Sequence, residues 1–265
     1  MIHLIFILTG IIVGLMSGMF GIGGGIIIFP IIFFTLTKLL FIPQHLSLSV
    51  AAATSLAITI PNLVVATIDY QKEKQIIWKI VLAMVPGLII GAIASSLFFV
   101  HYFNSHVIKL IFVSSTILIA IQIYFTHIGK DSTPNYPTKV ASFSAGLFIG
   151  TISGLLGIAG GEFSASFLNF HKIKIKDVVG TTSLVGLTVS IFGSLGFIIS
   201  GAKQAPINLE HSIGFIYLPA VIQICITSLI MVSIGEKFAQ KMRASHLKRY
   251  FSILVALTGL SMLFF

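Results

Sequence analysis

Long apolar runs follow one another along this sequence and leave only short polar connections between them. An α-helix needs roughly 20 apolar residues to cross a hydrocarbon core of about 30 Å. Inside that core every backbone polar group must find its hydrogen bond within the protein, which favours helices. The sequence therefore predicts an all-α membrane protein, with clear crossings at 46–66, 77–100, 107–126, 178–200, 212–234 and 249–265.

The charge content excludes the soluble classes of protein. Charged residues make up 9% of the chain and hydrophobic residues 56%, a balance with which a soluble domain of this length would aggregate. The net charge of +9 does not indicate a nucleic-acid partner, because no polar region is long enough to form a binding domain. We interpret the basic residues as topology signals, and the basic run 237–249 as an orientation anchor or a contact for anionic membrane lipid. We expect a multi-pass protein of the cell (inner) membrane whose apolar N-terminus is retained.

A glycine-rich segment occurs twice. The stretch 14–25 reads GLMSGMFGIGGG and the stretch 150–161 reads GTISGLLGIAGG, so the two align position by position without a gap, from Gly14 with Gly150 to Gly25 with Gly161. Both segments are sunk in hydrophobic sequence, which is unusual for a loop of a soluble protein. We call the two glycine clusters the first elbow (21–25) and the second elbow (157–161).

Two further matches follow in the same order. ATSL at 53–56 matches TTSL at 181–184, and Pro86 with Pro219 forms a weaker pair. Three landmarks in one order indicate a duplicated membrane unit, as in many secondary transporters. The predicted division is an N-terminal repeat at 1–126, a polar linker at 127–139 and a C-terminal repeat at 140–265.

The glycine segments, at 3–37 and 140–170, are each longer than one crossing and too short for two. Each forms one long broken helix or a re-entrant hairpin, and either choice surrounds the glycines with protein or a water-filled cavity. With two hairpins, 13 of the 16 basic residues share one side and three the other, whereas two full crossings give six against ten. Basic residues favour the cytoplasmic side. The charges favour two inverted repeats, each a glycine-elbow hairpin plus three transmembrane helices, although a broken helix ending short of the far leaflet fits similar charges.

These motifs resemble a known family. The duplicated glycine motif followed by a Thr-Ser helix is similar to the TauE/SafE sulfite exporter family of integral membrane proteins, over nearly the whole chain. The resemblance implies a secondary transporter, an exporter, of a small organosulfur anion such as sulfite or a sulfonate. The second copy departs from the family pattern, because Ala159 stands in place of a glycine and Glu162 follows the glycine pair.

The elbow glycines are candidates for anion binding. Without a Cβ they leave backbone N–H groups uncovered, and a helix that restarts after them presents further donors at its N-terminus. Related by a pseudo-two-fold axis, both elbows would face one cavity near the membrane midplane. The competing interpretation is close helix packing, which suits Gly14 and Gly150 well. The substrate-binding candidates are Gly21, Gly23, Gly24, Gly25, Gly157, Gly160 and Gly161.

Hydroxyl groups at matching positions of the second motif are further candidates for the same path: Thr54, Ser55, Thr182 and Ser183. Hydroxyls within a span often bond to a carbonyl of their own helix instead. Glu162 is the one carboxylate within a hydrophobic segment, where a charge near the bilayer centre costs about 2.5–3.5 kcal/mol. A bound anion would favour its protonated form, so Glu162 is the candidate for proton coupling. The alternative is an acid that only stabilises a helix N-terminus.

No catalytic or metal site is indicated by the sequence. The eight histidines lie at span ends or in loops without the spacing of metal ligands, and the one cysteine, Cys225, lies within an apolar run. We therefore expect no enzyme activity, no cofactor and no metal. A scaffold or sensor subunit that binds an anion without moving it is the alternative function, and association into a homo-oligomer stays open.

Overall fold

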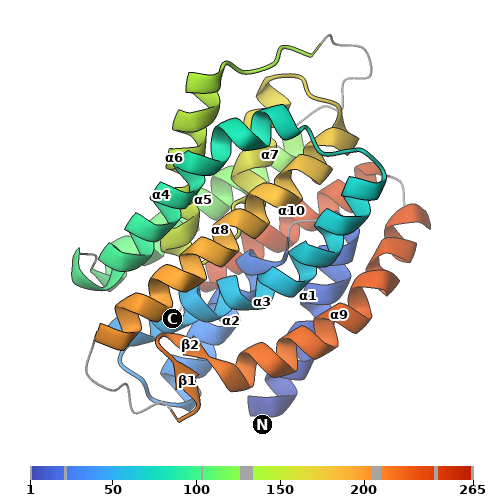
Figure 1. Cartoon of the computed structure of the whole chain (residues 1–265). Helices are drawn as coiled ribbons and strands as arrows, with labels where there is room; N and C mark the ends of the chain where they lie inside the picture. Colours follow the sequence, from blue (N-terminus) through green and yellow to red (C-terminus); the bar gives the residue numbers. More distant parts are fainter. Residues whose placement is uncertain are drawn as a thin grey trace.

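The computed structural model of this chain describes residues 2–20, 23–102, 104–125, 134–203, 210–241 and 244–263. Six of the described helices are long and apolar enough to cross a membrane, so the prediction of an all-α membrane protein holds apart from two short strands. Figure 1 shows long helices that run between the two ends of the molecule. The elements are α1 (Ile2–Phe20), α2 (Gly25–Phe34), a stretch of π-helix η1 (Thr35–Leu39), α3 (Gln44–Lys72), α4 (Trp78–Tyr102), α5 (Ser105–Phe125), α6 (Lys139–Leu156), α7 (Gly161–Phe170), α8 (Ile175–Lys203), β1 (Ser212–Ile213), β2 (Ile216–Tyr217), α9 (Leu218–Lys241) and α10 (Ala244–Ser261).

The predicted crossing at 212–234 is wrong at its start. Residues 212–217 form an antiparallel pair of short strands instead of a helical turn. Gly214 turns the chain with a φ of +57°, a conformation that glycine adopts at little cost. α9 then begins at Leu218 with Pro219 in its first turn, where a proline is tolerated. The predicted crossings at 46–66, 77–100, 107–126 and 178–200 each match one helix long enough to span a membrane. The crossing at 249–265 falls on α10, whose described apolar part is only Ser252–Ser261, and residues 126, 264 and 265 lie outside the described part of the chain.

Each glycine segment contains two helices with a break between them, α1 and α2 in the first and α6 and α7 in the second. Gly24 precedes α2 with φ +79° and ψ 9°, and Gly160 precedes α7 with φ +83° and ψ 2°. A residue with a side chain is disfavoured in this left-handed region by about 1–2 kcal/mol. These glycines therefore set the point at which each second helix begins.

The long helices α3 and α8 cross in opposite directions. Thr59 Oγ1 and Ser190 Oγ are 2.9 Å apart, and further along α3 Thr67 Oγ1 donates to Ser183 Oγ at 3.5 Å. Residue numbers rise along α3 where they fall along α8. The start of α3 therefore lies at the same end of the molecule as the end of α8.

Helices α1 and α2 together lead into the molecule and back to the end at which they began. Gly201, near the end of α8, lies against the backbone of Gly214 in the strand pair. Shortly after that pair, Gln223 Oε1 lies 3.1 Å from His3 Nδ1. The start of α1 thus shares an end with the end of α8 and the start of α3. Figure 1 shows the N-terminus and the connection into α3 at the lower edge.

Small residues let two helix pairs approach closely, α1 with α9 and α6 with α4. A Cβ added to Gly14 would lie 2.3 Å from the carbonyl oxygen of Ser228, and one added to Gly150 would lie 2.5 Å from that of Leu88. Neither distance is possible for a real Cβ. The packing interpretation of these two glycines therefore has direct structural support.

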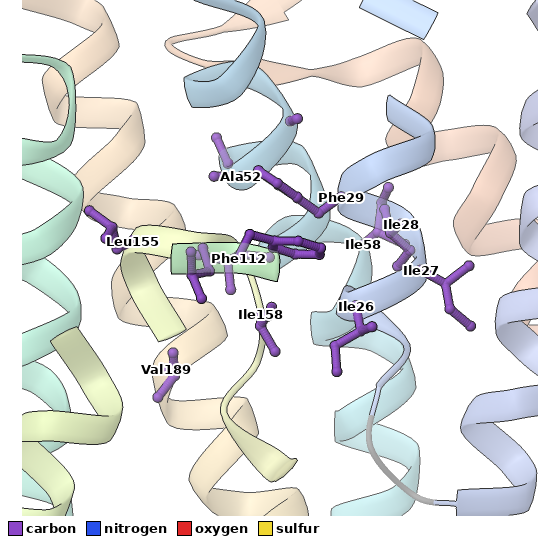
Figure 2. Packing of buried hydrophobic residues seen from close by; sticks show 14 of the residues in the cluster. Ile26, Ile27, Ile28, Phe29, Ala52, Ile58, Phe112, Leu155, Ile158 and Val189 are labelled. Carbon is purple, nitrogen blue, oxygen red and sulfur yellow. The ribbon is translucent and has the colours of Figure 1, made fainter. Parts of the chain in front are cut away.

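Apolar side chains surround the breaks between the helices. Phe29 of α2 stacks on Phe112 of α5 with ring centroids 4.8 Å apart, and both rings are fully buried. Figure 2 shows this pair together with Ile26 and Ile158, one from each glycine segment. In a bilayer it is van der Waals packing, more than exclusion of water, that holds such helices together.

Candidate functional site

The two elbows touch each other inside the molecule. A Cβ built on Gly25, the first residue of α2, would lie 3.2 Å from the carbonyl oxygen of Gly157 and 3.3 Å from the Cα of Ile158. Figure 2 shows the chain segment that carries Ile158 beside the first turn of α2, where Ile26 lies. Two helix breaks that belong to different copies of the repeat thus meet at one place.

The first elbow is packed mainly against apolar side chains. Gly21 lies outside the described residues. Gly23 has a φ of +73° and faces Leu63 of α3, while a Cβ on Gly24 would lie 2.6 Å from Val13 of α1. Ser55, one of the predicted hydroxyls, is fully buried and donates to the carbonyl oxygen of Gly25 at 3.2 Å.

The second elbow uses its glycines at different positions. Gly157 ends α6 with φ +67°, and a Cβ there would lie 2.5 Å from the Cα of Ala52 on α3. Gly160 takes the left-handed conformation before α7, and Ala159 lies outside the left-handed region. The elbow therefore tolerates an alanine at 159, although the matching Gly23 needs to be a glycine.

The helix that follows the second elbow presents free donors at its N-terminus. The first backbone bond of α7 runs from the N–H of Ser164 to the carbonyl oxygen of Gly160, at 3.0 Å. The N–H groups of the three preceding residues, 161–163, therefore have no carbonyl partner within the helix, and that of Glu162 interacts with its own carboxyl group. Together with the helix dipole they favour a negative charge at this point.

Glu162 lies in that first turn and is 4% exposed. Its Oε2 has no hydrogen-bond partner among the described residues. One turn later, Ser166 Oγ donates to the backbone carbonyl oxygen of Glu162 at 2.9 Å and not to its carboxyl group. A buried carboxyl oxygen without a partner is expected to bind a ligand, to carry a proton or to bond to water.

Sequence reasoning missed Ser153, which lies at the same helix N-terminus. It is fully buried, and its Oγ has no partner among the described residues. That oxygen lies 2.8 Å from the position a Cβ would occupy on Gly160. The signal that could have found it is the repeat itself, in which Ser153 pairs with Ser17.

Three of the four predicted hydroxyls make bonds away from the elbows. Thr54 Oγ1 accepts from the N–H of Tyr217 at 3.0 Å and so holds β2 against α3. Thr182 and Ser183 each donate to a carbonyl one turn back on α8, at 3.0 and 2.8 Å. The structure therefore brings Ser55 into hydrogen-bonding contact with an elbow, and gives the other three structural partners.

The family model described as Sulfite exporter TauE/SafE matches residues 6–262. The chain belongs to the TauE/SafE sulfite exporter family. The resemblance seen in the duplicated glycine motif is thereby confirmed over nearly the whole length.

Relatives match most or all of this TauE/SafE protein. It is 30% identical over 260 residues to a "Probable membrane transporter protein" of Haemophilus influenzae, covering 98% of this chain and 97% of the relative. It is 28% identical over 261 residues to a protein of the same description from Methanocaldococcus jannaschii, covering 97% and 94%. The Bacillus subtilis protein YunE, also a "Probable membrane transporter protein", is 28% identical over 222 residues, 76% of this chain and 80% of its own. No solved structure matches this chain.

Other candidate chemistry is sparse in this TauE/SafE protein. The described residues contain no group of three His, Cys, Asp or Glu side chains that could hold a metal ion. Cys225 is buried, with its Sγ 3.7 Å from the carbonyl oxygen of Ile58, and packs as a small apolar side chain. Among the described residues, the second elbow is thus the place where unpaired buried oxygens and free helix N–H groups occur together.

Proposed function

We propose that this TauE/SafE protein is a secondary transporter that exports a small organosulfur anion, such as sulfite or a sulfonate, across the inner cell membrane. Membership of the family carries the coarser part of this function, a multi-pass membrane transporter and not an enzyme. The family's description as a sulfite exporter is the reason for choosing an organosulfur anion and the outward direction.

The contact between the two elbows is the observation that carries the anion site. Gly25 lies against Gly157 and Ile158, so the breaks that precede α2 and α7 come together in the interior. Irregular backbone at membrane depth is tolerated where protein or a water-filled cavity surrounds it, and discontinuous helices of this kind form the midplane sites of many carriers. Helix N-termini there would attract an anion without a fixed positive side chain.

Alternating access follows from two inverted repeats. In support, α1 packs on α9 through Gly14, and α6 packs on α4 through Gly150, the glycine at the matching position of the second copy. The central helices α3 and α8, which carry the second repeated motif, run in opposite directions. Two halves that pack alike in opposite orientations can present one central site to each side of the membrane in turn.

Coupling to protons is assigned to Glu162. As a carboxylate it would repel an anion at the N-terminus of α7, and as the neutral acid it would donate to one. Anion and proton would therefore bind together, and a transport cycle would carry both or neither.

Counterflow in proteoliposomes tests the function. Vesicles containing the purified protein are loaded with unlabelled sulfite, and uptake of a trace of radiolabelled sulfite is followed after dilution. We expect a transient uptake above that of protein-free vesicles. Saturable binding of sulfite without exchange would instead indicate the scaffold or sensor function, and neither binding nor exchange would remove sulfite as the substrate.

A further inference from the structure

We propose that the two elbows have different roles: the second elbow binds the substrate oxyanion and a proton together, through Ser153, Glu162 and the first turn of α7, whereas the first elbow is a closed packing joint. This inference rests on the proposed function, because it locates the anion site that the function requires.

The internal repeat makes the comparison position by position. In the alignment that pairs Gly24 with Gly160, Ser17 pairs with Ser153 and Ile26 with Glu162. The backbone before the second helix is nearly the same in both copies, with φ values of +79° and +83°. The elbows differ one residue earlier, where Gly23 is left-handed and the matching Ala159 is not, and they differ in the groups that surround them.

The groups that face the described glycines of the first elbow are apolar side chains and backbone. Gly23 faces Leu63, Gly24 faces Val13, and Gly25 faces the backbone of the second elbow. The sequence of α2, GIIIFPIIFF, contains no polar side chain, and its residues 26–29 are at most 4% exposed. The one hydroxyl that bonds to this elbow, Ser55, already donates to a carbonyl oxygen. None of these groups around the first elbow is a polar side chain with a free donor for an anion.

Around the second elbow buried polar atoms lack partners. Ser153 Oγ is fully buried beside Gly160, and Glu162 Oε2 lies in the following turn with its residue 4% exposed. Neither atom has a partner among the described residues, and the N–H groups of Gly161 and Phe163 have no carbonyl partner within α7. Burying a polar group without a hydrogen bond is unfavourable, so these atoms are expected to bond to something that enters from water.

The unpaired atoms define the chemistry of the ligand. The site offers a hydroxyl hydrogen, backbone N–H groups and the positive end of a helix dipole. These groups favour a ligand that is negatively charged and accepts hydrogen bonds. A small oxyanion with several oxygens can accept from more than one of them at once. Glu162 adds a donor only as the neutral acid, so the anion and a proton taken from water share this site.

Titratable side chains on the helices that pack against α7 lie near the ends of those helices or of α7 itself. Among the described residues, the one salt bridge joins Lys72 and Asp69, away from Glu162. The groups concerned are His106, Lys109 and Tyr124 on α5, Lys139 on α6, Lys176, Asp177 and Lys203 on α8, and His171 after α7.

Binding of radiolabelled sulfite to matched variants of the purified protein tests the inference. Ser153→Ala removes the proposed contact, and Ser17→Ala is the control at the matching position of the first copy. Loss of one hydrogen bond to a charged ligand corresponds to about a 10- to 100-fold weaker Kd, which we expect for Ser153→Ala. For Ser17→Ala we expect less than about a twofold change, and wild-type protein should bind one sulfite per chain.

Thermal unfolding of the same variants separates binding from structure. Ser153→Ala removes a buried hydroxyl without a partner, so its melting temperature should equal or exceed that of wild type. Weaker binding at unchanged stability is a result that a merely structural serine would not give. Equal weakening by both alanine variants, or two bound anions per chain, would overturn the division of roles.

A second measurement does not depend on sulfite being the substrate. In a background without Cys225, Ser153→Cys and Ser17→Cys variants are treated in proteoliposomes with an anionic methanethiosulfonate reagent that carries a sulfonate group. We expect the thiol at 153 to react faster, because the anion path leads to the second elbow. Equal or slower reaction at 153 would overturn the inference. Absence of sulfite binding together with faster reaction at 153 would remove the substrate in the proposed function and leave the site in place.

Discussion

Gly14→Ala and Gly150→Ala should both destabilise the protein, although alanine normally favours a helix over glycine. The added Cβ of Gly150→Ala would lie 2.5 Å from the carbonyl oxygen of Leu88, and that of Gly14→Ala 2.3 Å from the carbonyl oxygen of Ser228. Ordinary van der Waals contact begins at 3.4 Å, so the backbones must separate by 3.4 − 2.5 = 0.9 Å and 3.4 − 2.3 = 1.1 Å. The changes strain the contacts of α1 with α9 and of α6 with α4, and the two glycines hold matching positions in the alignment of the glycine segments.

The magnitude follows from two opposing effects. Overpacking costs about 1–3 kcal/mol, and the upper part of that range, about 2–3 kcal/mol, applies where the added atom meets backbone; the helix preference of alanine offsets about 1 kcal/mol of it. We expect a net loss of about 1–2 kcal/mol for each variant. At about 2–4 °C per kcal/mol for a chain of this size, the melting temperature should fall by about 2–8 °C.

Gly193→Ala is the matched control, because it lies within α8 and its Cβ would meet only a side chain, the Cδ1 of Leu56 at 2.7 Å. A terminal methyl group can rotate away, so we expect no loss of stability. The assay is thermal unfolding of the three variants and wild type, purified in one detergent and followed by intrinsic fluorescence. Unchanged melting of Gly14→Ala and Gly150→Ala, or an equal loss in Gly193→Ala, would refute the backbone-contact reasoning.

Four further predictions concern the site and its orientation. Gly160→Val should abolish counterflow while protein remains in the membrane, because a branched side chain disfavours φ +83°; normal counterflow at matched expression would exclude a role for this elbow. Thr54→Val should cost about 1–3 kcal/mol of stability by leaving the N–H of β2 unpaired, yet keep the Kd for sulfite; a weaker Kd would return Thr54 to the binding site. In a cysteine-free background, Phe41→Cys should react with an impermeant reagent outside intact cells and Lys172→Cys should not, and the reverse pattern would invert the predicted orientation. Glu162→Gln should keep exchange but lose the rise in net flux as pH falls, measured with an alkylsulfonate of fixed charge; a wild-type pH profile would leave Glu162 as a helix-stabilising acid.

The sequence predicted those features that depend on local backbone chemistry. A run of glycines disfavours a continuous helix wherever it occurs, so the breaks before α2 and α7 could be placed within a few residues. The duplication was visible because both segments carry glycines at the point where one helix ends and the next begins. The role of Gly14 and Gly150 in close packing also followed, since small residues in apolar helices are typical of helix contacts.

Partners that lie far apart along the chain could not be predicted in the same way. Thr54 bonds to the N–H of Tyr217, in the other half of the chain, and nothing in either local sequence specifies that pairing. Ser153 became a candidate only when the structure placed its oxygen beside Gly160 without a partner. The strand pair at 212–217 was missed because its residues are as apolar as those of a span, and one glycine decides the turn.

The exchange of helices between the two halves has a consequence for biogenesis. α1 finds its main partner, α9, only after the whole stretch from Gly21 to Tyr217 has been synthesised, since α9 begins at Leu218. At about 5–20 residues per second, a newly inserted α1 waits roughly 10–40 s beside the ribosome with its glycine face uncovered. Neither half completes its packing alone, because α6 in turn needs α4. Two fragments separated within the linker should therefore accumulate only when they are synthesised in the same cell, and each by itself should be a substrate for membrane quality-control proteases.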